Sequence, residues 1–222
     1  MPKEEPRWHA GIAVLAALAL YVTLPNKVLV GPVWVLPLVI LLILVPLTIV
    51  SPRRHQETAW QRWLSIGHIA VLNGFNIATI VLLLFWQISE RHTAHRHLTG
   101  EEMLVAAVQI WVTNVIVYAL WFWELDGHGP DVRMHTSFVQ EPRRADFLFP
   151  QMTLEPEIRE RIKWKPMFID YLFLAFTNAT AFSPADTFPL TRFAKVLMMA
   201  EALASLVTIA IIAGRAIGIL GV

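Results

Sequence analysis

Five long runs of apolar residues constrain this chain more than any other feature of its sequence. A helix needs about 20 consecutive apolar residues to cross the hydrocarbon core of a bilayer. The runs cover residues 10–26, 28–50, 64–89, 103–123 and 193–220, and 56% of the 222 residues are hydrophobic. We therefore predict an all-α integral membrane protein with about five transmembrane helices, located as a multi-pass protein in the cytoplasmic (plasma) membrane.

Charge and cysteine content exclude several other classes of protein. The 18 basic and 17 acidic side chains nearly balance, without a dense basic block, so no nucleic-acid partner is predicted. Cysteine is absent, which excludes disulfides, thiolate metal sites and cysteine nucleophiles. The chain also lacks Ser-x-x-Lys, Gly-x-Ser-x-Gly and His-Glu-x-x-His patterns. We expect neither an enzyme nor a cofactor.

Two polar connectors contain residues with possible chemistry. His92, His95 and His97 can bind a transition metal or sense pH, but a solvated loop explains them better, so no metal site is predicted. Residues 126–131 (DGHGPD) contain two Asp and one His, residue types that a membrane hydrolase uses, yet turn chemistry accounts for this stretch. Thr99 and Glu102 are spaced for a capping box that begins a helix.

The stretch 170–191 is apolar enough to enter a membrane but too polar for an ordinary span. It contains Pro184, Pro189 and the polar residues Asp170, Thr177, Asn178, Thr180, Ser183 and Asp186. Irregular backbone is tolerated in a bilayer only where protein or a water-filled cavity satisfies its polar groups. This stretch therefore predicts a re-entrant helix and loop in preference to a kinked sixth span.

From Asp170 onward the chain resembles the pore module of tetrameric potassium channels, the pore-loop ion channel superfamily. Asp170 opens the stretch, residues 178–186 (NATAFSPAD) follow at the spacing of the family's T-x-T-T-V-G-Y-G-D, and Pro189 lies three residues later. The resemblance implies two regions. Residues 1–100 would be peripheral transmembrane helices 1 to 3. Residues 101–222 would be the pore module, with an outer helix 102–124, a turret 125–165, a pore helix and filter-like loop 166–187, and an inner helix 190–220.

The filter-like loop departs from the family pattern where selectivity is decided. Ser183, Pro184 and Ala185 stand where the family has Gly-Tyr-Gly. The usual filter is a ladder of backbone carbonyls, and its glycines adopt conformations that a side chain penalises. Proline also fixes φ near about −65° and removes a hydrogen-bond donor. The selectivity filter is degenerate, so potassium selectivity is not expected.

The resemblance implies a role for individual residues. The pore and filter-like set comprises Thr177, Asn178, Thr180, Ala181, Phe182, Ser183, Pro184, Ala185 and Asp186. In a homotetramer Asp186 would form an acidic ring that attracts inorganic cations. Thr180 and Ser183 would line the narrow part, while Thr177 and Asn178 would satisfy the last carbonyls of the pore helix. Asp170 and Glu201 would support the pore, and Ser205 would lie near a gate.

Three functions are consistent with these features. The first is a cation-conducting homotetramer in the lipid bilayer, with the turret outside the cell. The second is a non-conducting membrane scaffold or partner subunit that reuses the pore fold. The third is a small membrane enzyme or carrier. Glu201 is a candidate functional residue because it is ionisable within a span, although a carboxylate buried behind the loop and bonded to its backbone is the favoured interpretation.

Overall fold

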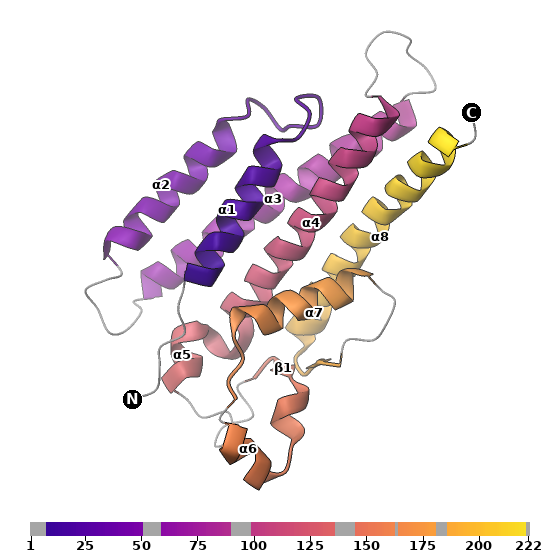
Figure 1. Cartoon of the computed structure of the whole chain (residues 1–222). Coiled ribbons are helices and arrows are strands. Elements are labelled where there is room, and N and C mark those ends of the chain that lie inside the picture. Colours follow the sequence, from indigo (N-terminus) through magenta and orange to yellow (C-terminus); the bar gives the residue numbers. More distant parts are fainter. Residues whose placement is uncertain are drawn as a thin grey trace.

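A computed structural model describes residues 8–50, 59–89, 99–135, 145–162, 164–180 and 186–220. It is mostly helical, with 81% of the described residues in helices (Figure 1). The helices are α1 (Trp8–Val22), α2 (Val35–Val50), α3 (Ala59–Ser89), α4 (Gly100–Leu125), α5 (Pro130–His135), α6 (Pro156–Ile162), α7 (Phe168–Thr180) and α8 (Arg192–Leu220). Short 3-10 turns, η2 (Asp126–His128) and η4 (Pro150–Thr153), and two strands, β1 (Phe147–Leu148) and β2 (Phe188–Pro189), complete the order.

Three helices are long and apolar enough to cross a membrane. They cover Trp60–Ile88, Gly100–His128 and Arg192–Ile217. Helix α4 lies at the centre of the bundle, in contact with α1, α3, α7 and α8. Its position explains why its side chains are the most buried of the three. These helices support a membrane protein built around α4.

The first two predicted spans are shorter than the sequence suggests. Helices α1 and α2 have 15 and 16 residues. At about 1.5 Å per residue each is under about 25 Å long, less than the roughly 30 Å of a hydrocarbon core. The sequence Pro-Asn-Lys at residues 25–27 predicts a tight turn between these two helices, but the structure has a connection over residues 23–34, in which Gly31 has φ +80°. The amide of Val35 donates to the carbonyl of Pro32, so α2 begins seven residues later than predicted.

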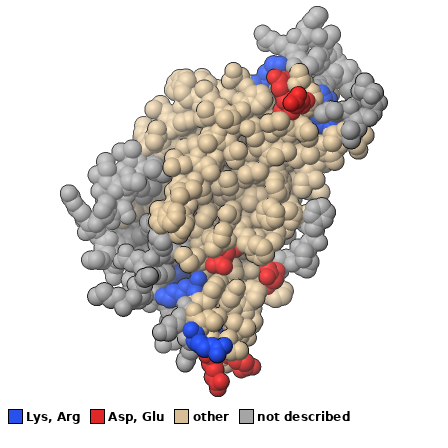
Figure 2. Space-filling model, viewed as in Figure 1, with Lys and Arg blue, Asp and Glu red and all other residues tan. Residues whose placement is uncertain are grey.

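Charged side chains lie toward the two ends of the bundle. On the face drawn in Figure 2, the Lys, Arg, Asp and Glu side chains leave a wide uncharged band between them. Large apolar side chains are exposed along the helices, including Leu42 (70%), Phe85 (60%) and Leu203 (64%). Such an apolar surface is expected for helices that contact lipid.

Two local predictions about helix starts can be compared directly with the structure. The capping box at α4 is confirmed, because Thr99 Oγ1 accepts from the Glu102 amide and Glu102 Oε2 accepts from the Thr99 amide. Helix α6 begins at Pro156, where the sequence predicts it. Thr153 does not cap that helix, however. Its hydroxyl donates to the carbonyl of Pro150, and the first helical bond of α6 is accepted by Glu155.

The aromatic residues at the end of α4 are packed inside the protein. The sequence predicts them at the lipid interface. Phe122 is fully buried, with its ring centroid 5.1 Å from that of Phe147 in β1. Trp123 is 5% exposed, and its ring lies 6.1 Å from that of Phe168 in α7. The end of α4 is therefore covered by the segment that follows it, and this segment positions the site described next.

Candidate functional site

The segment from α7 to the start of α8 begins and ends beside the same end of α4. Tyr171, in the first turn of α7, donates its hydroxyl to Asp126 just beyond α4, at 2.6 Å. Thr191, just before α8, donates its hydroxyl to Asp146 at 2.7 Å, and the amide of Asp146 in turn bonds Asp126. Strand β2 pairs antiparallel with β1, so that Phe188 lies opposite Leu148. Both ends of the segment are thus bonded to one pair of linked residues, Asp126 and Asp146.

The last turns of α7 reach farther into the bundle. Asn178 Nδ2 donates to Glu201 Oε2 at 2.7 Å and to the carbonyl of Met198 at 2.9 Å. Glu201 lies about 14 Å along α8 at about 1.5 Å per residue. On the opposite side, the ring of Phe176 lies 6.0 Å from that of Trp111 of α4. Helix α7 therefore runs from the end of the bundle to its interior, between α4 and α8.

Asp126 is the centre of the anchoring cluster. It is 0% exposed. Its Oδ1 accepts from the amides of Asp146 (2.7 Å) and Phe147 (3.3 Å), and its Oδ2 accepts from Tyr171. A buried carboxylate is stable only when its oxygens are paired in this way. Asp126 therefore joins β1 and α7 to the end of α4.

Arg133 supplies the positive charge of the same cluster. Its Nη1 donates to the carbonyls of Trp123 and Asp126, both at 2.6 Å. Its guanidinium carbon lies 5.0 Å from the centroid of the Tyr171 ring, in the range of a cation–π contact. We call Asp126, Arg133, Asp146, Tyr171 and Thr191 the Asp126 cluster.

Sequence reasoning found the turn at Asp126 but missed this cluster. The turn is confirmed, since Gly127, His128 and Gly129 all have positive φ and the Gly129 amide donates to the Asp126 carbonyl. Turn chemistry does not account for the side chain of Asp126, contrary to our interpretation from sequence. One available signal was that a charged residue directly follows a long apolar helix.

A second set of polar side chains lies in the interior of the bundle. Asn76 of α3 donates to Asn114 Oδ1 of α4 at 3.0 Å. Asn114 Nδ2 in turn donates to Ser205 Oγ of α8 at 2.9 Å, and it lies 3.5 Å from the carbonyl of Glu201. With Asn178 these residues form the Glu201 cluster, which links α3, α4, α7 and α8. Hydrogen bonds of this kind join helices within a membrane.

The two residues assigned to pore support and gating on α8 face the interior of the protomer. Glu201 is 0% exposed and Ser205 is 1% exposed. Glu201 bonds the side chain of Asn178, where the sequence suggested the backbone of the loop. Ser205 accepts from Asn114. Its assignment as a gate stays a prediction, and the structure places it against α4, away from the exposed side of α8.

Two threonines of the pore set bond carbonyls of their own helix. Thr177 donates to the carbonyls of Phe173 (2.9 Å) and Leu174 (3.0 Å), and Thr180 donates to the carbonyl of Thr177 (2.9 Å). Thr180 thus satisfies a carbonyl in the last turn of α7. Asn178 does not satisfy a carbonyl of α7 as predicted, because its amide donates to Met198 and Glu201 of α8.

Of the remaining predicted residues, the structure describes Asp170 and Asp186. Asp170 accepts from the Met167 amide at 2.8 Å and so caps the start of α7. Partial burial raises the pKa of Asp170, and this hydrogen bond opposes the shift. Asp186 is exposed, just before β2. The predicted filter-like residues Ala181, Phe182, Ser183, Pro184 and Ala185 lie outside the described residues.

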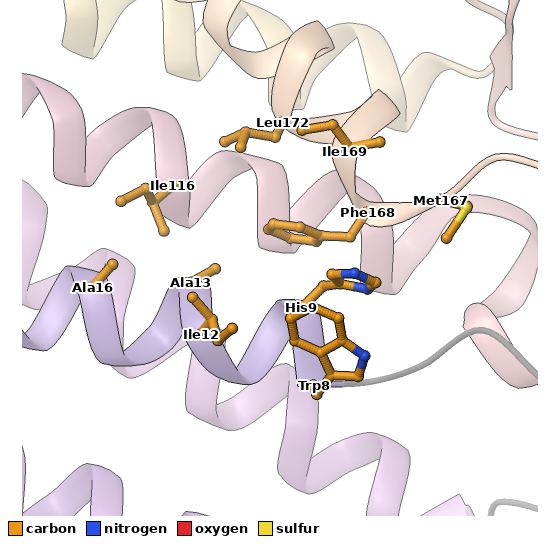
Figure 3. A pocket seen from close by; sticks show the side chains of 10 residues that line it. All are labelled: Trp8, His9, Ile12, Ala13, Ala16, Ile116, Met167, Phe168, Ile169 and Leu172. Carbon is orange, nitrogen blue, oxygen red and sulfur yellow. The ribbon is translucent and has the colours of Figure 1, made fainter.

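An apolar groove of about 350 Å³ separates the start of α1 from the start of α7 (Figure 3). Trp8, His9 and Ile12 line one side, and Phe168 and Leu172 face them. The lining offers contacts for an apolar group and, apart from His9, no side chain suited to acid–base chemistry.

No metal site emerges from the part of the chain that the structure describes. Within it, no three His, Asp or Glu side chains are grouped so that they could hold an ion. The three histidines of the 90–100 connector, His92, His95 and His97, lie outside the described residues.

Comparison with known proteins adds no relative. No protein-family model, no curated protein and no solved structure matches the chain.

Proposed function

We propose that this protein is a pore-loop membrane protein that conducts cations as a homotetramer, without standard potassium selectivity. The path of the segment 168–191 carries the proposal. Its two ends bond the Asp126 cluster through Tyr171 and Thr191, while its middle reaches Glu201. A segment with this path enters a bilayer and returns to the same side, as a re-entrant pore loop does.

The length of α7 supports the same interpretation. Its 13 residues extend about 20 Å at about 1.5 Å per residue, too short to cross a core of about 30 Å. The chain returns by β2 to the end where α7 begins, and non-helical backbone within a bilayer must be covered by protein or lie in a water-filled cavity. Because the C-terminal end of α7 points into the bundle, its partial negative charge would favour a cation near the turn.

Asp186 is positioned for the role of an acidic mouth. It is exposed on the returning part of the segment, two residues before β2. Four such carboxylates around an axis would raise the local concentration of cations and repel anions. The exposed surface of α8 carries Phe193, Val196, Met199 and Leu203 together with Arg192 and Lys195, so the inner helix of the proposed tetramer would present an apolar surface that begins beyond Lys195.

Site-directed labelling tests the re-entrant path. The chain has no cysteine, so single cysteines can be introduced without a background. We expect Glu157→Cys and Phe188→Cys to react with a membrane-impermeant maleimide from the same, external side of intact cells. Asn26→Cys, at the other end of the bundle, should react only after permeabilisation. Labelling of Glu157→Cys and Phe188→Cys from opposite sides would contradict a re-entrant segment.

Current across a planar bilayer tests conduction. We expect purified tetramers to give a cation-selective reversal potential under asymmetric KCl, with little change when Na⁺ replaces K⁺. Asp186→Asn should move the reversal potential toward zero, because the acidic ring is lost. Glu157→Gln is the matched control, an exposed carboxylate on α6 that should leave the potential unchanged.

A non-conducting scaffold or partner subunit is the second candidate. The exposed Met199, Leu203 and Leu206 of α8, which follow Lys195 along the helix, favour it, because an apolar constriction can exclude water and ions. Protein that is tetrameric yet carries no current at any voltage, pH or membrane tension would select this function. A monomeric protein would instead favour the membrane enzyme or carrier.

A further inference from the structure

Glu201 is an acidic side chain buried deep in the bundle. It is 0% exposed and sits on a helix long and apolar enough to span a membrane. Its Oε2 accepts one hydrogen bond, from Asn178. Its Oε1 is buried and has no hydrogen-bond partner within the described part of the chain. One half of this carboxyl group is therefore unpaired.

No cation compensates Glu201 among the described residues. No Lys or Arg there forms an ion pair with it. Lys195, on the same helix, is exposed on another side. An ionised carboxylate that is buried without a positive partner is so costly that such groups take up a proton. The neutral acid leaves only one polar oxygen to satisfy, which is a far smaller penalty.

The surroundings of Glu201 are polar but uncharged. The hydroxyl of Tyr118 on α4 interacts with Asn73 of α3 and electrostatically with Glu201. The other titratable or charged groups lie farther along the packed helices: Arg62 and His68 on α3, Glu101, Glu102 and Glu124 on α4, Asp170 and Tyr171 at the far end of α7, and Arg192, Lys195 and Arg215 on α8. The two cavities described in the structure are lined by other residues.

We propose that Glu201 is a proton-binding site inside each protomer, neutral while its carboxyl group holds Asn178, and that loss of the proton loosens α7 from α8. The proton resides on Oε1 and exchanges with solvent. When it leaves, a negative charge remains in a dry interior, and water must reach it for that charge to be tolerated. The amide of Asn178 stabilises this charge only at Oε2, so water must reach Oε1, which has no donor among the described residues, and α7 must move away from α8 to admit it. The proposal does not depend on conduction.

Infrared spectroscopy of the purified protein in lipid tests whether Glu201 is protonated. We expect the carbonyl band of a protonated carboxylic acid at neutral pH, shifted by D₂O and by isotope-labelled glutamate. Glu201→Gln should remove this band. Glu157→Gln, which alters an exposed glutamate, should leave it unchanged. If the band is absent, or if it survives in Glu201→Gln, the proton-binding site is ruled out.

Hydrogen exchange of the α7 amides tests whether loss of the proton loosens α7 from α8. At each pH the wild-type protein is compared with Glu201→Gln, so that the general acceleration of exchange by base cancels. We expect α7 amides to exchange faster than in the variant at alkaline pH and equally at acid pH. Equal exchange in the wild type and in Glu201→Gln at every pH would show that the Glu201 proton does not control the packing of α7. If Glu201→Gln does not fold, Asn178→Leu provides the second variant, and it should keep the infrared band but shift its frequency.

Discussion

Replacing Asp126 with alanine is expected to lower the free energy of unfolding by about 3 to 5 kcal/mol, the usual cost of breaking a buried charged pair. The substitution removes the acceptor of Tyr171 and of the Asp146 and Phe147 amides. It also removes the negative charge that acts electrostatically on the buried Arg133. The measurement is an unfolding titration with SDS in mixed micelles.

Two further variants make the test of Asp126 specific. Tyr171→Phe removes only the hydroxyl that Asp126 accepts, and it should cost about 1 to 3 kcal/mol. Glu157→Ala, on the exposed side of α6, should change stability by no more than about 0.5 kcal/mol. If Asp126→Ala is as stable as Glu157→Ala, the cluster does not hold α7 and β1 to the end of α4.

Replacing Phe122 with alanine is expected to cost a similar amount, about 3 to 5 kcal/mol, through loss of apolar packing and the cavity left behind. Phe122 is fully buried between Tyr118 and Phe147, with ring centroids 6.2 and 5.1 Å away. The same SDS titration measures the loss. Phe173→Ala is the matched control, because Phe173 is 53% exposed on α7 and contacts the surrounding lipid or detergent. Equal losses for both variants would mean that the end of α4 is not a packed core.

The two polar clusters hold opposite ends of α7. The Asp126 cluster fixes the beginning of α7 and the beginning of α8 at one end of the bundle. The Glu201 cluster holds the end of α7 in the interior through a bond to a single side chain, Asn178. A helix held firmly at one end and by one amide at the other can move at its inner end, which is where the predicted filter-like loop begins.

Some of the site was predictable from the residues and some was not. Asp170, Asn178 and Glu201 were selected because polar residues within apolar segments need partners, and the structure gives each of them one. The sequence does not indicate that Asn178 bonds Glu201, because Glu201 lies 23 residues away on another helix. The sequence likewise does not indicate which side of α8 Ser205 faces. Apolar residues surround that helix on all sides, so hydropathy does not distinguish its buried face.

The sequence by itself determined the features that depend on neighbouring residues. These are the three long apolar helices, the capping box at Thr99 and the turn at Asp126, all set by hydropathy and local backbone preference. The tertiary structure alone decided the late start of α2 and the Asp126 cluster. Tyr171 and Asp126 are 45 residues apart, and no periodicity joins them. They meet because an unpaired charge cannot remain buried, a requirement that acts only once the helices have packed.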